Sequence, residues 1–569
     1  MLKKIVFLSV ALTTLFLTLP NMQFETSPVC VSSNGNLTSQ ESQVVAMISG
    51  LSAYNYDLEL EKIGLNHSVS NYAFRSGGSA GATAAAMWLK EQFESFGLET
   101  QLESFEFTNW NMLSQPTLVI DEDGVIDTTE DQISVNSFQS EHYSWSTPEG
   151  GVFKDLVVLP LPTAANFSEI GAKPINTTLW NATSTLDKIV LIGREVRWDH
   201  AWEVTYQAKL NAQPPAAVIY TWWYNWTSFT PPFFSSLGGR PTSTWGPYYW
   251  KLKIPVGWVN YADGLLIRNR NNLSAKVIIQ SVIGSGLHYN VVGRLQGSIN
   301  PDSLVIVSGH YDTVVTAGFV DNGAGTAGVL ELARIFSDAV HKGVYNPDYT
   351  ILFVGFASEE LGLVGSTNYV RQHKDEMNDI VAVINLDCIG SDNFNVAPTS
   401  PSKGLDLDDL VLKAAGDLNV SATLTEPGGS DQEVFRSPGW ADASYSYWWP
   451  GLSSGISNAA PVESSTMLIS YPLFYSDKWN RGYPGWIHTS YDNSTSTQTL
   501  DWLERVNLEE QIKVAALSIV RVSPSSQDVV SPPLFPWWIL GVVAVAAVAA
   551  VAVVYFVKVR EPPVKNVVR

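Results

Sequence analysis

Two hydrophobic patterns alternate in the second half of the chain. Short, continuous apolar runs at 304–308, 351–356 and 381–386 have the length and the Val, Ile and Leu content of buried strands. Between them, 322–339 and 361–372 carry apolar residues every three or four positions, which is the period of an amphipathic helix. Uninterrupted apolar strands that alternate with amphipathic helices indicate the α/β class, with a mostly parallel mixed sheet flanked by helices.

The first half of the chain shows two further patterns. Residues 82–96 predict a helix that stops at Gly97, and 98–107 alternate like a strand, which suits the start of the same α/β layer. From 111 to 285, short β-like runs replace the helical period, apart from a helical stretch at 202–210. The clearest of these runs are 151–159, 188–192 and 216–220. We therefore expect a β-rich domain inserted into the α/β domain.

Both ends of the chain contain apolar stretches of their own. Residues 1–20 combine two lysines with an apolar run, as a secretory signal peptide does, and an uncleaved anchor is the alternative. Residues 537–557 carry no charge and are long enough to span a bilayer, and the tail at 558–569 is basic. The Ser- and Pro-rich segment 522–536 suits a linker. These features predict a single-pass protein of the cell membrane, with its bulk extracellular and a short cytoplasmic C-terminus.

Glycosylation signals agree with export. Asn-X-Ser/Thr sequons without an intervening proline begin at Asn36, Asn66, Asn166, Asn176, Asn181, Asn225, Asn272, Asn419 and Asn493. The two cysteines, Cys30 and Cys388, lie far apart, so the chain does without a disulfide framework. We expect a glycoprotein that is stabilised by its core and by bound metal.

Composition narrows the classes of function. The chain has 569 residues, 45% of them hydrophobic, which suffices for two or three globular domains. Its formal net charge is −21, and no basic stripe offsets the carboxylates. A nucleic-acid partner is therefore not expected, because nucleic-acid binding relies on clustered positive charge.

Residues that commonly bind metals gather where the three apolar runs end. They are His310, Asp312, Asp321, Glu359, Glu360 and Asp387. Each alone has a plainer interpretation, such as a helix N-cap for Asp321. Because parallel strands bring their carboxyl ends to one edge, and because crowded carboxylates are unfavourable without a cation, a divalent ion is the simplest explanation. Carboxylates and imidazoles without a thiolate pair suit zinc, with cobalt or manganese as alternatives.

A second imidazole is expected from His488. This histidine lies in a polar loop after a Gly-Tyr-Pro-Gly turn and before the helix predicted at 500–517. The remaining histidines lack such a setting and are interpreted as surface or structural residues: His67, His142, His200, His288, His341 and His373.

Five sequence blocks together resemble the M28 family of zinc aminopeptidases and related carboxypeptidases. They are SGHYDTV (308–314), VDNGAG (320–325), ASEELGLVGS (357–366), NLD (385–387) and IHT (487–489). Their order and spacing fit the family over 286–520, and 70–107 fits less closely. In the insert, KIVLI (188–192), AAVI (216–219) and IPVGWVNYADG (254–264) resemble a protease-associated domain.

The resemblance implies a domain organisation. The N-terminal part of the peptidase domain would occupy 21–110, the protease-associated-like insert 111–285 and the catalytic zinc peptidase domain 286–521. Peptides are the implied substrates. A homodimer and the preferred side chain stay open.

The resemblance also implies roles for the candidate residues. Asp321 would bridge two zinc ions, with His310 and Asp387 on one ion and Glu360 and His488 on the other. Glu359 would be the general base, and Asp312 would orient His310 from the second layer. The expected function is that of a zinc-dependent exopeptidase, with an aminopeptidase as the first choice. A carboxypeptidase, a glutaminyl-cyclase-like enzyme and a catalytically silent receptor or scaffold are the alternatives.

One position departs from the family pattern, and one role in that pattern is not assigned to a residue. Gln432 stands where the family usually has the histidine of a Ser-Asp-His segment, which puts nearby substrate contacts in doubt. The donor that would stabilise the oxyanion is not identified among four candidates, Tyr445, Tyr447, Tyr483 and Tyr491.

Overall fold

The structure is a computed structural model of the whole chain. The residues that it describes are 37–69, 75–122, 132–141, 143–159, 181–194, 209–222, 253–314, 316–425, 429–449, 452–470, 487–488, 492–500 and 503–522. The predicted signal peptide, the linker after Val522, the membrane span at 537–557 and the basic tail lie outside these residues. Among the described residues, no helix combines the length and the apolar composition that crossing a membrane requires.

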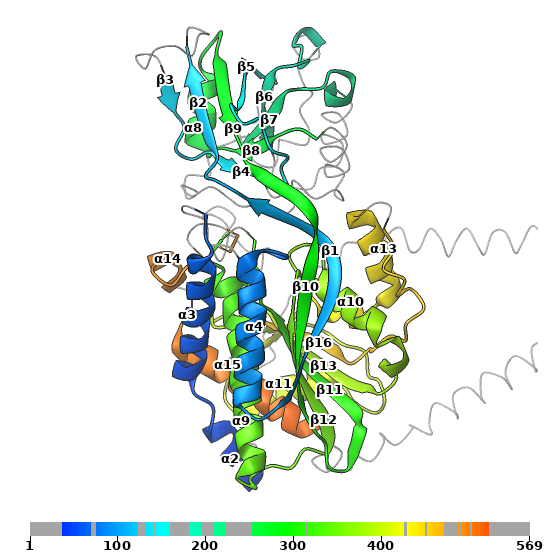
Figure 1. The fold of residues 1–569 in the computed structure, drawn as a ribbon. Coiled ribbons are helices and arrows are strands. Elements are labelled where there is room, and N and C mark those ends of the chain that lie inside the picture. The colour runs from blue at the N-terminus through cyan, green and yellow to red at the C-terminus, as the bar shows by residue number, and fades with distance from the viewer. Residues whose placement is uncertain are drawn as a thin grey trace, which may run out of the picture. The chain divides into compact units, whose positions relative to one another are not determined.

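A mixed eight-stranded sheet forms the centre of the first domain (Figure 1). In spatial order its strands are β1 (Glu99–Met112), β10 (Ser281–Leu295), β12 (Tyr349–Phe356), β11 (Asn300–His310), β13 (Ile380–Leu386), β16 (Ser465–Ile469), β14 (Asn395–Val396) and β15 (Thr423–Leu424). The central strands β12, β11, β13 and β16 are parallel, whereas β1 and β10 pair antiparallel at one edge. The predicted strands and the α/β class are therefore confirmed.

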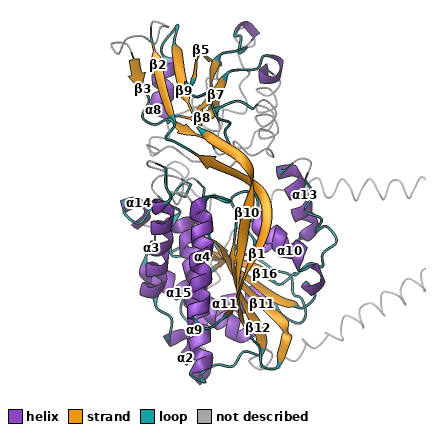
Figure 2. Cartoon of the chain, in the orientation of Figure 1, coloured by secondary structure: helices purple, strands orange, loops and turns teal. Residues whose placement is uncertain are grey.

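Helices cover both faces of this sheet, as Figure 2 shows. One face packs against α3 (Gly50–Asn66), α4 (Ala80–Ser95), α9 (Gly325–His341) and α15 (Arg505–Val522). The other face packs against α10 (Val364–Gln372), α12 (Gln432–Arg436) and α13 (Pro438–Trp448). The remaining helices of this domain in the described residues are α2 (Ser39–Ala46), α11 (Leu407–Asp417), α14 (Thr497–Leu500) and the short η2 (Phe319–Ala324) and η3 (Lys374–Glu376).

Burial on both faces explains the continuous apolar runs. In β11, Val305 and Val307 join the core on the α9 side, while Leu304 and Ile306 join the core on the α10 side. Successive strand residues point to opposite faces, so a strand covered on both sides needs an apolar residue at every position.

The predicted β-rich insert forms a second eight-stranded sheet. Its spatial order is β3 (Gln132–Ser134), β2 (Thr117–Asp121), β9 (Ser274–Ile278), β5 (Val152–Val158), β6 (Ile189–Arg194), β7 (Ala217–Trp222), β8 (Val256–Trp258) and β4 (Gln139–Ser140). The run from β5 to β8 is parallel, and helix α8 (Tyr261–Arg268) was not expected from the sequence. Most of the helix predicted at 202–210 lies outside the described residues.

One long antiparallel pair joins the two sheets through the chain. β1 and β10 stay in register from Glu99 opposite Arg294 to Met112 opposite Ser281. β1 continues into β2 of the second sheet, and β9 of that sheet leads back into β10. The insert therefore leaves and re-enters the first domain through neighbouring strands.

Candidate metal centre

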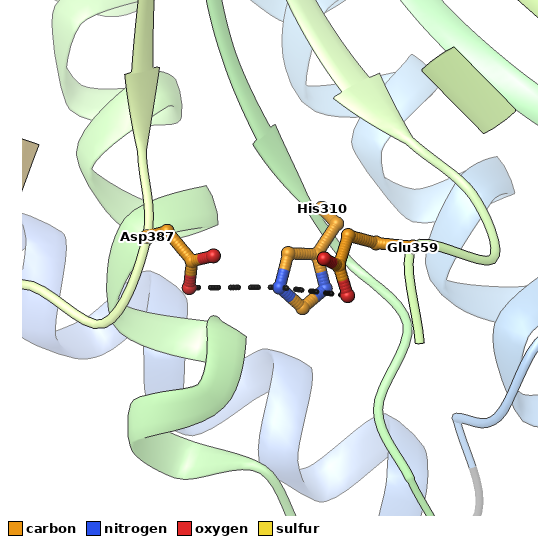
Figure 3. Close-up of side chains that lie close together, drawn as sticks. All are labelled: His310, Glu359 and Asp387. Atoms are coloured by element: carbon orange, nitrogen blue, oxygen red, sulfur yellow. Dashed lines mark ion pairs between the residues drawn. The ribbon is translucent and has the colours of Figure 1, made fainter. Parts of the chain in front are cut away.

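The carboxyl ends of three parallel strands bring the first group of site residues together. His310 is the last residue of β11, Glu359 follows β12 and Asp387 follows β13. Figure 3 shows the His310 ring between the two carboxylates. Its Nε2 lies 3.6 Å from Oδ1 of Asp387 and 3.9 Å from Oε2 of Glu359. All three offer an oxygen or nitrogen atom to one small volume.

A second group, Asp321, Glu360 and His488, lies beside the first, and Asp321 also faces His310 of the first group. Nε2 of His488 is 3.0 Å from Oδ2 of Asp321 and 3.0 Å from Oε1 of Glu360. The other oxygen of Asp321, Oδ1, lies 3.4 Å from Nε2 of His310. Asp321 therefore presents one oxygen to each group, and the two groups form one continuous site.

The loop that carries Asp321 is held from both sides. Asp321 and Asn322 are joined by a cis peptide bond within the π-helical turn η2 (Phe319–Ala324). The Asn322 side chain accepts from the Cys388 amide at 3.0 Å and donates to the Leu386 carbonyl at 2.9 Å, which ties the turn to the end of β13. Asp492 accepts from the amides of Val320 at 2.7 Å and Asp321 at 3.3 Å.

Asp312 supports the site through both its main chain and its side chain. Nδ1 of His310 lies 3.1 Å from the main-chain carbonyl of Asp312 and 3.6 Å from its carboxylate. The carboxylate instead accepts from the amides of Glu359 at 2.9 Å and Glu360 at 3.4 Å. Asp312 therefore orients the imidazole through its main chain and holds the Glu359–Glu360 corner through its side chain.

Arg75 is a buried cation whose role no sequence motif indicates. Its side chain is fully buried, and its guanidinium donates to the carbonyls of Tyr311, Ala317 and Gly318 at 2.9 to 3.0 Å. These carbonyls belong to the segment between His310 and Asp321. The signal in the sequence was a single arginine before Ser76 and two glycines, which has no distinctive spacing.

The charges of the site favour a cation. Burial alone would lower the pKa of His310, but the charge of Glu359 and the contacts with Asp312, Asp321 and Asp387 raise it well above its usual value. Burial would raise the pKa of Asp321, but the histidines His310 and His488 hold it well below its usual range. Burial and the neighbouring carboxylates raise the pKa of Glu359 well above its usual value, against the opposing effect of His310. The pocket is therefore short of positive charge.

The residues fit bound zinc. Two donor atoms at about 2.1 Å from one tetrahedral zinc ion are separated by about 3.4 Å. The observed separations from His310 to Asp321 and Asp387 are 3.4 and 3.6 Å, and those from His488 to Asp321 and Glu360 are 3.0 Å. Oδ1 of Asp387 is buried and makes no hydrogen bond within the described part of the chain. A buried carboxylate oxygen in this condition calls for a cation.

The structure describes the surroundings of Gln432 and of one candidate for the oxyanion donor. Gln432 is fully buried at the start of α12, where its Oε1 lies 3.4 Å from Nδ2 of Asn385. Of the four candidate tyrosines, Tyr445 alone has its side chain in the described part of the chain. Burial raises the pKa of Tyr445 to about 12, and its ring packs against Phe107.

Part of the chain is similar in sequence to known peptidases. Residues 290–509 match the model of peptidase family M28. A probable glutamate carboxypeptidase of Arabidopsis thaliana is 30% identical over 217 residues, which are 38% of this chain and 28% of that protein. An aminopeptidase of Pseudomonas aeruginosa is 35% identical over 143 residues, which are 25% of each protein. The chain thus matches about a quarter of the length of these relatives.

Solved structures share the fold. A zinc aminopeptidase from Bacillus subtilis superposes with a TM-score of 0.58 and 19% identity, over 84% of this chain and 97% of that one. An aminopeptidase from Aneurinibacillus gives a TM-score of 0.53 and 20% identity, over 85% of this chain and 96% of that one. Residues 290–509 are thus similar to peptidase family M28, and the described part of the chain shares the fold of solved zinc aminopeptidases.

Proposed function

We propose that the protein is a zinc-dependent exopeptidase, in the first place an aminopeptidase, that works with two zinc ions. The observation that carries this proposal is the division of Asp321 between the two groups. Its Oδ1 faces His310 at 3.4 Å and its Oδ2 faces His488 at 3.0 Å. A carboxylate placed in this way can bridge two cations, as the catalytic sites of two-metal hydrolases require.

Each ion would have its own ligands besides Asp321. His310 and Asp387 would hold one ion, and Glu360 and His488 would hold the other. His310 can donate its Nδ1 proton to the carbonyl of Asp312 at 3.1 Å, which leaves Nε2 free as a ligand. Bound zinc would polarise the scissile carbonyl and lower the pKa of water.

Glu359 is the proton carrier in this proposal. Its amide is fixed by Asp312, while its carboxylate lies beside His310 at the edge of the site and is 14% exposed. It would accept a proton from the attacking water and pass it to the leaving amine. Glu360 is the next residue along the chain but faces His488, so the two adjacent glutamates have different roles.

The base assignment is tested by replacing Glu359 with glutamine. Glu359→Gln keeps the shape of the side chain but cannot accept the proton, so hydrolysis should fall by about a hundredfold or more. Zinc content, measured by elemental analysis, should stay unchanged at two ions per chain. Glu376→Gln is the matched control, because Glu376 lies in η3 with a side chain that is 55% exposed. A Glu359→Gln protein that hydrolyses peptides at the normal rate would refute the assignment.

The end of the peptide that is attacked can be decided with blocked substrates. An aminopeptidase should cleave a peptide with a free amino terminus and an amidated carboxyl terminus, but not its N-acetylated counterpart. The Arabidopsis relative is named a probable glutamate carboxypeptidase, so the reverse result would favour that activity. Release of ammonia from an N-terminal glutamine without shortening would indicate cyclase-like chemistry. No reaction by the zinc-loaded protein would favour a receptor or scaffold.

We extend the proposal to location and to the insert. The uncharged segment 537–557, the signal-like N-terminus and the sequons support a membrane-anchored enzyme with its catalytic domain outside the cell. The three motifs of the insert support a protease-associated domain. In membrane fractions washed with alkaline carbonate, the full chain should stay with the membrane, and a chain that ends at Val522 should be released.

A further inference from the structure

Ser358, which directly precedes the proposed base, has an unusual main-chain conformation. Its φ is +58°, in the left-handed region that residues with a β-carbon rarely adopt. This conformation turns the chain out of β12 and into the Glu359–Glu360 corner. A conformation that is disfavoured in isolation persists where its surroundings hold it.

His288 provides a contact that holds Ser358. It lies on β10 with 2% of its surface exposed. Its Nδ1 is 2.6 Å from Oγ of Ser358, and its Nε2 is 2.5 Å from Oδ1 of Asn109 on β1. The ring also stacks on Phe105 at a centroid distance of 5.4 Å. Both ring nitrogens and one ring face are therefore used.

The neighbouring groups fix which nitrogen of His288 carries the proton. Nδ2 of Asn109 donates to the carbonyl of Gly78 at 2.8 Å, which directs Oδ1 of Asn109 toward the imidazole. An amide oxygen only accepts, so Nε2 of His288 must be the donor. Nδ1 is then the acceptor in a neutral ring, and the Ser358 hydroxyl donates to it. Burial lowers the pKa of His288 to about 4, so the ring stays neutral at neutral pH.

Glycines make room for this chain of contacts. A β-carbon on Gly78 would lie 2.1 Å from Oδ1 of Asn109, and one on Gly286 would lie 2.0 Å from its Nδ2. A β-carbon on Gly77 would lie 2.4 Å from Oγ of Ser358. All three distances are shorter than atoms tolerate, so Asn109 and Ser358 have little freedom to shift.

Other hydrogen bonds also hold the Glu359–Glu360 corner. The amides of Glu359 and Glu360 donate to the Asp312 carboxylate, and the carbonyl of Leu361 accepts from Nε1 of Trp449 at 3.0 Å. The contact between His288 and Ser358 adds a hydrogen bond at the residue that directly precedes Glu359.

We propose that His288 is a positioning residue for Glu359, which it keeps in place by holding the Ser358 hydroxyl. His288 does not reach the metal ligands and takes no proton from the substrate. The inference rests on the proposed function, because it requires Glu359 to be the base. Its consequence is that loss of the histidine should impair the chemical step more than substrate binding.

The main experiment compares His288→Phe with the unmodified full chain, loaded with zinc. Phenylalanine retains the stacking on Phe105 but loses both hydrogen bonds. We expect kcat to fall by about tenfold or more, because small displacements of a catalytic group strongly reduce the rate. KM should change by less than about twofold, since the variant removes no contact that binds the substrate equally in its ground state and its transition state. Zinc content should stay the same.

Two further variants separate positioning from general packing. His288→Gln retains an acceptor and a donor, so it should restore part of the lost kcat. His373→Phe is the matched control, because His373 stacks on Tyr369 at 4.3 Å and binds Glu103, away from the corner. It should leave kcat unchanged. In the unmodified protein, imidazole ¹⁵N shifts of His288 should report the neutral ring protonated at Nε2.

A double-mutant cycle distinguishes the inference from the proposed function. In a Glu359→Gln background, His288→Phe should have no further effect on the residual rate, because it acts through Glu359. Normal kcat in His288→Phe, or an equal further loss in the Glu359→Gln background, would overturn the inference while leaving the base assignment intact. Full activity of Glu359→Gln alone would instead overturn the proposed function. If His288→Phe does not fold, Ser358→Ala decides the question by the same criteria.

Discussion

Arg75→Met should destabilise the protein strongly, because Arg75 holds the segment between two site residues. Methionine fills much of the same apolar space but donates no hydrogen bond. The three carbonyls of Tyr311, Ala317 and Gly318 would lose their partner in a fully buried location. Burial raises the pKa of Asp57, and the positive charge of Arg75 counteracts this effect. Neither oxygen of Asp57 has a hydrogen-bond partner within the described residues, so the loss of this cation would leave its carboxylate without compensation.

The size of the effect follows from these contacts. A hydrogen bond to a charged group contributes about 1.5 to 3 kcal/mol, so three such bonds set an upper range of about 5 to 9 kcal/mol. Such contributions are not additive, and removal of one partner from a buried charged pair usually costs about 3 to 5 kcal/mol. We therefore expect the free energy of unfolding to fall by about 4 kcal/mol.

Urea unfolding of the zinc-free protein measures this difference without a contribution from metal binding. Arg294→Met is the control, because Arg294 makes an exposed hydrogen bond to Gln296 and its loss should change stability by less than about 0.5 kcal/mol. A loss of less than about 1 kcal/mol in Arg75→Met would refute the view that these carbonyls depend on the guanidinium.

Three other predictions concern the surroundings of the site. Gly323→Ala should destabilise the turn and weaken zinc binding, because its β-carbon would lie 2.1 Å from Oδ1 of Asp57, and thermal unfolding with and without zinc measures both effects. Asp492→Ala should lower zinc affinity by about 10- to 100-fold, since two amides that position Asp321 lose their acceptor, and competition with a zinc chelator tests this. The pKa of His288 is lowered to about 4 in the folded state, so below its unfolded value the unfolded chain binds the extra proton. The contribution of neutral His288 to the free energy of unfolding should be fully present above about pH 6.5. It should fall by about 3 kcal/mol as the pH drops to about 4, at about 1.4 kcal/mol for each pH unit. In urea titrations, His288→Phe should remove this part of the pH dependence.

The sequence predicted the residues that gather at strand ends, and the physical reason is local. β11, β12 and β13 were recognisable because burial on both faces favours a continuous apolar run in each strand. The polar residues that follow each strand then stand out against the apolar background. The structure brings together His310, Asp321, Glu359, Glu360, Asp387 and His488.

The supporting residues were harder to predict because their partners are main-chain atoms or distant side chains. Arg75 binds carbonyls that follow it by more than 230 residues, and a carbonyl leaves no mark in the sequence. The sequence around His288 does not reveal its contacts, because its partners Asn109 and Ser358 come from two other strands or strand ends. Asp312 lies beside His310 as the spacing suggests, but the hydrogen bonds of its carboxylate to the amides of Glu359 and Glu360 have no signal in the sequence.

The pairing of β1 with β10 has a consequence for how such a chain can be shortened. Met112 and Ser281 face each other across the ladder, so everything from 113 to 280 is, in topological terms, the turn of one β-hairpin. The entropy of closing a loop grows only slowly with its length, so a hairpin tolerates a whole domain in this place. Replacing 113–280 by a two-residue turn should leave the first sheet able to close, and the insert becomes a removable module whose effect on substrate choice can be measured by deletion.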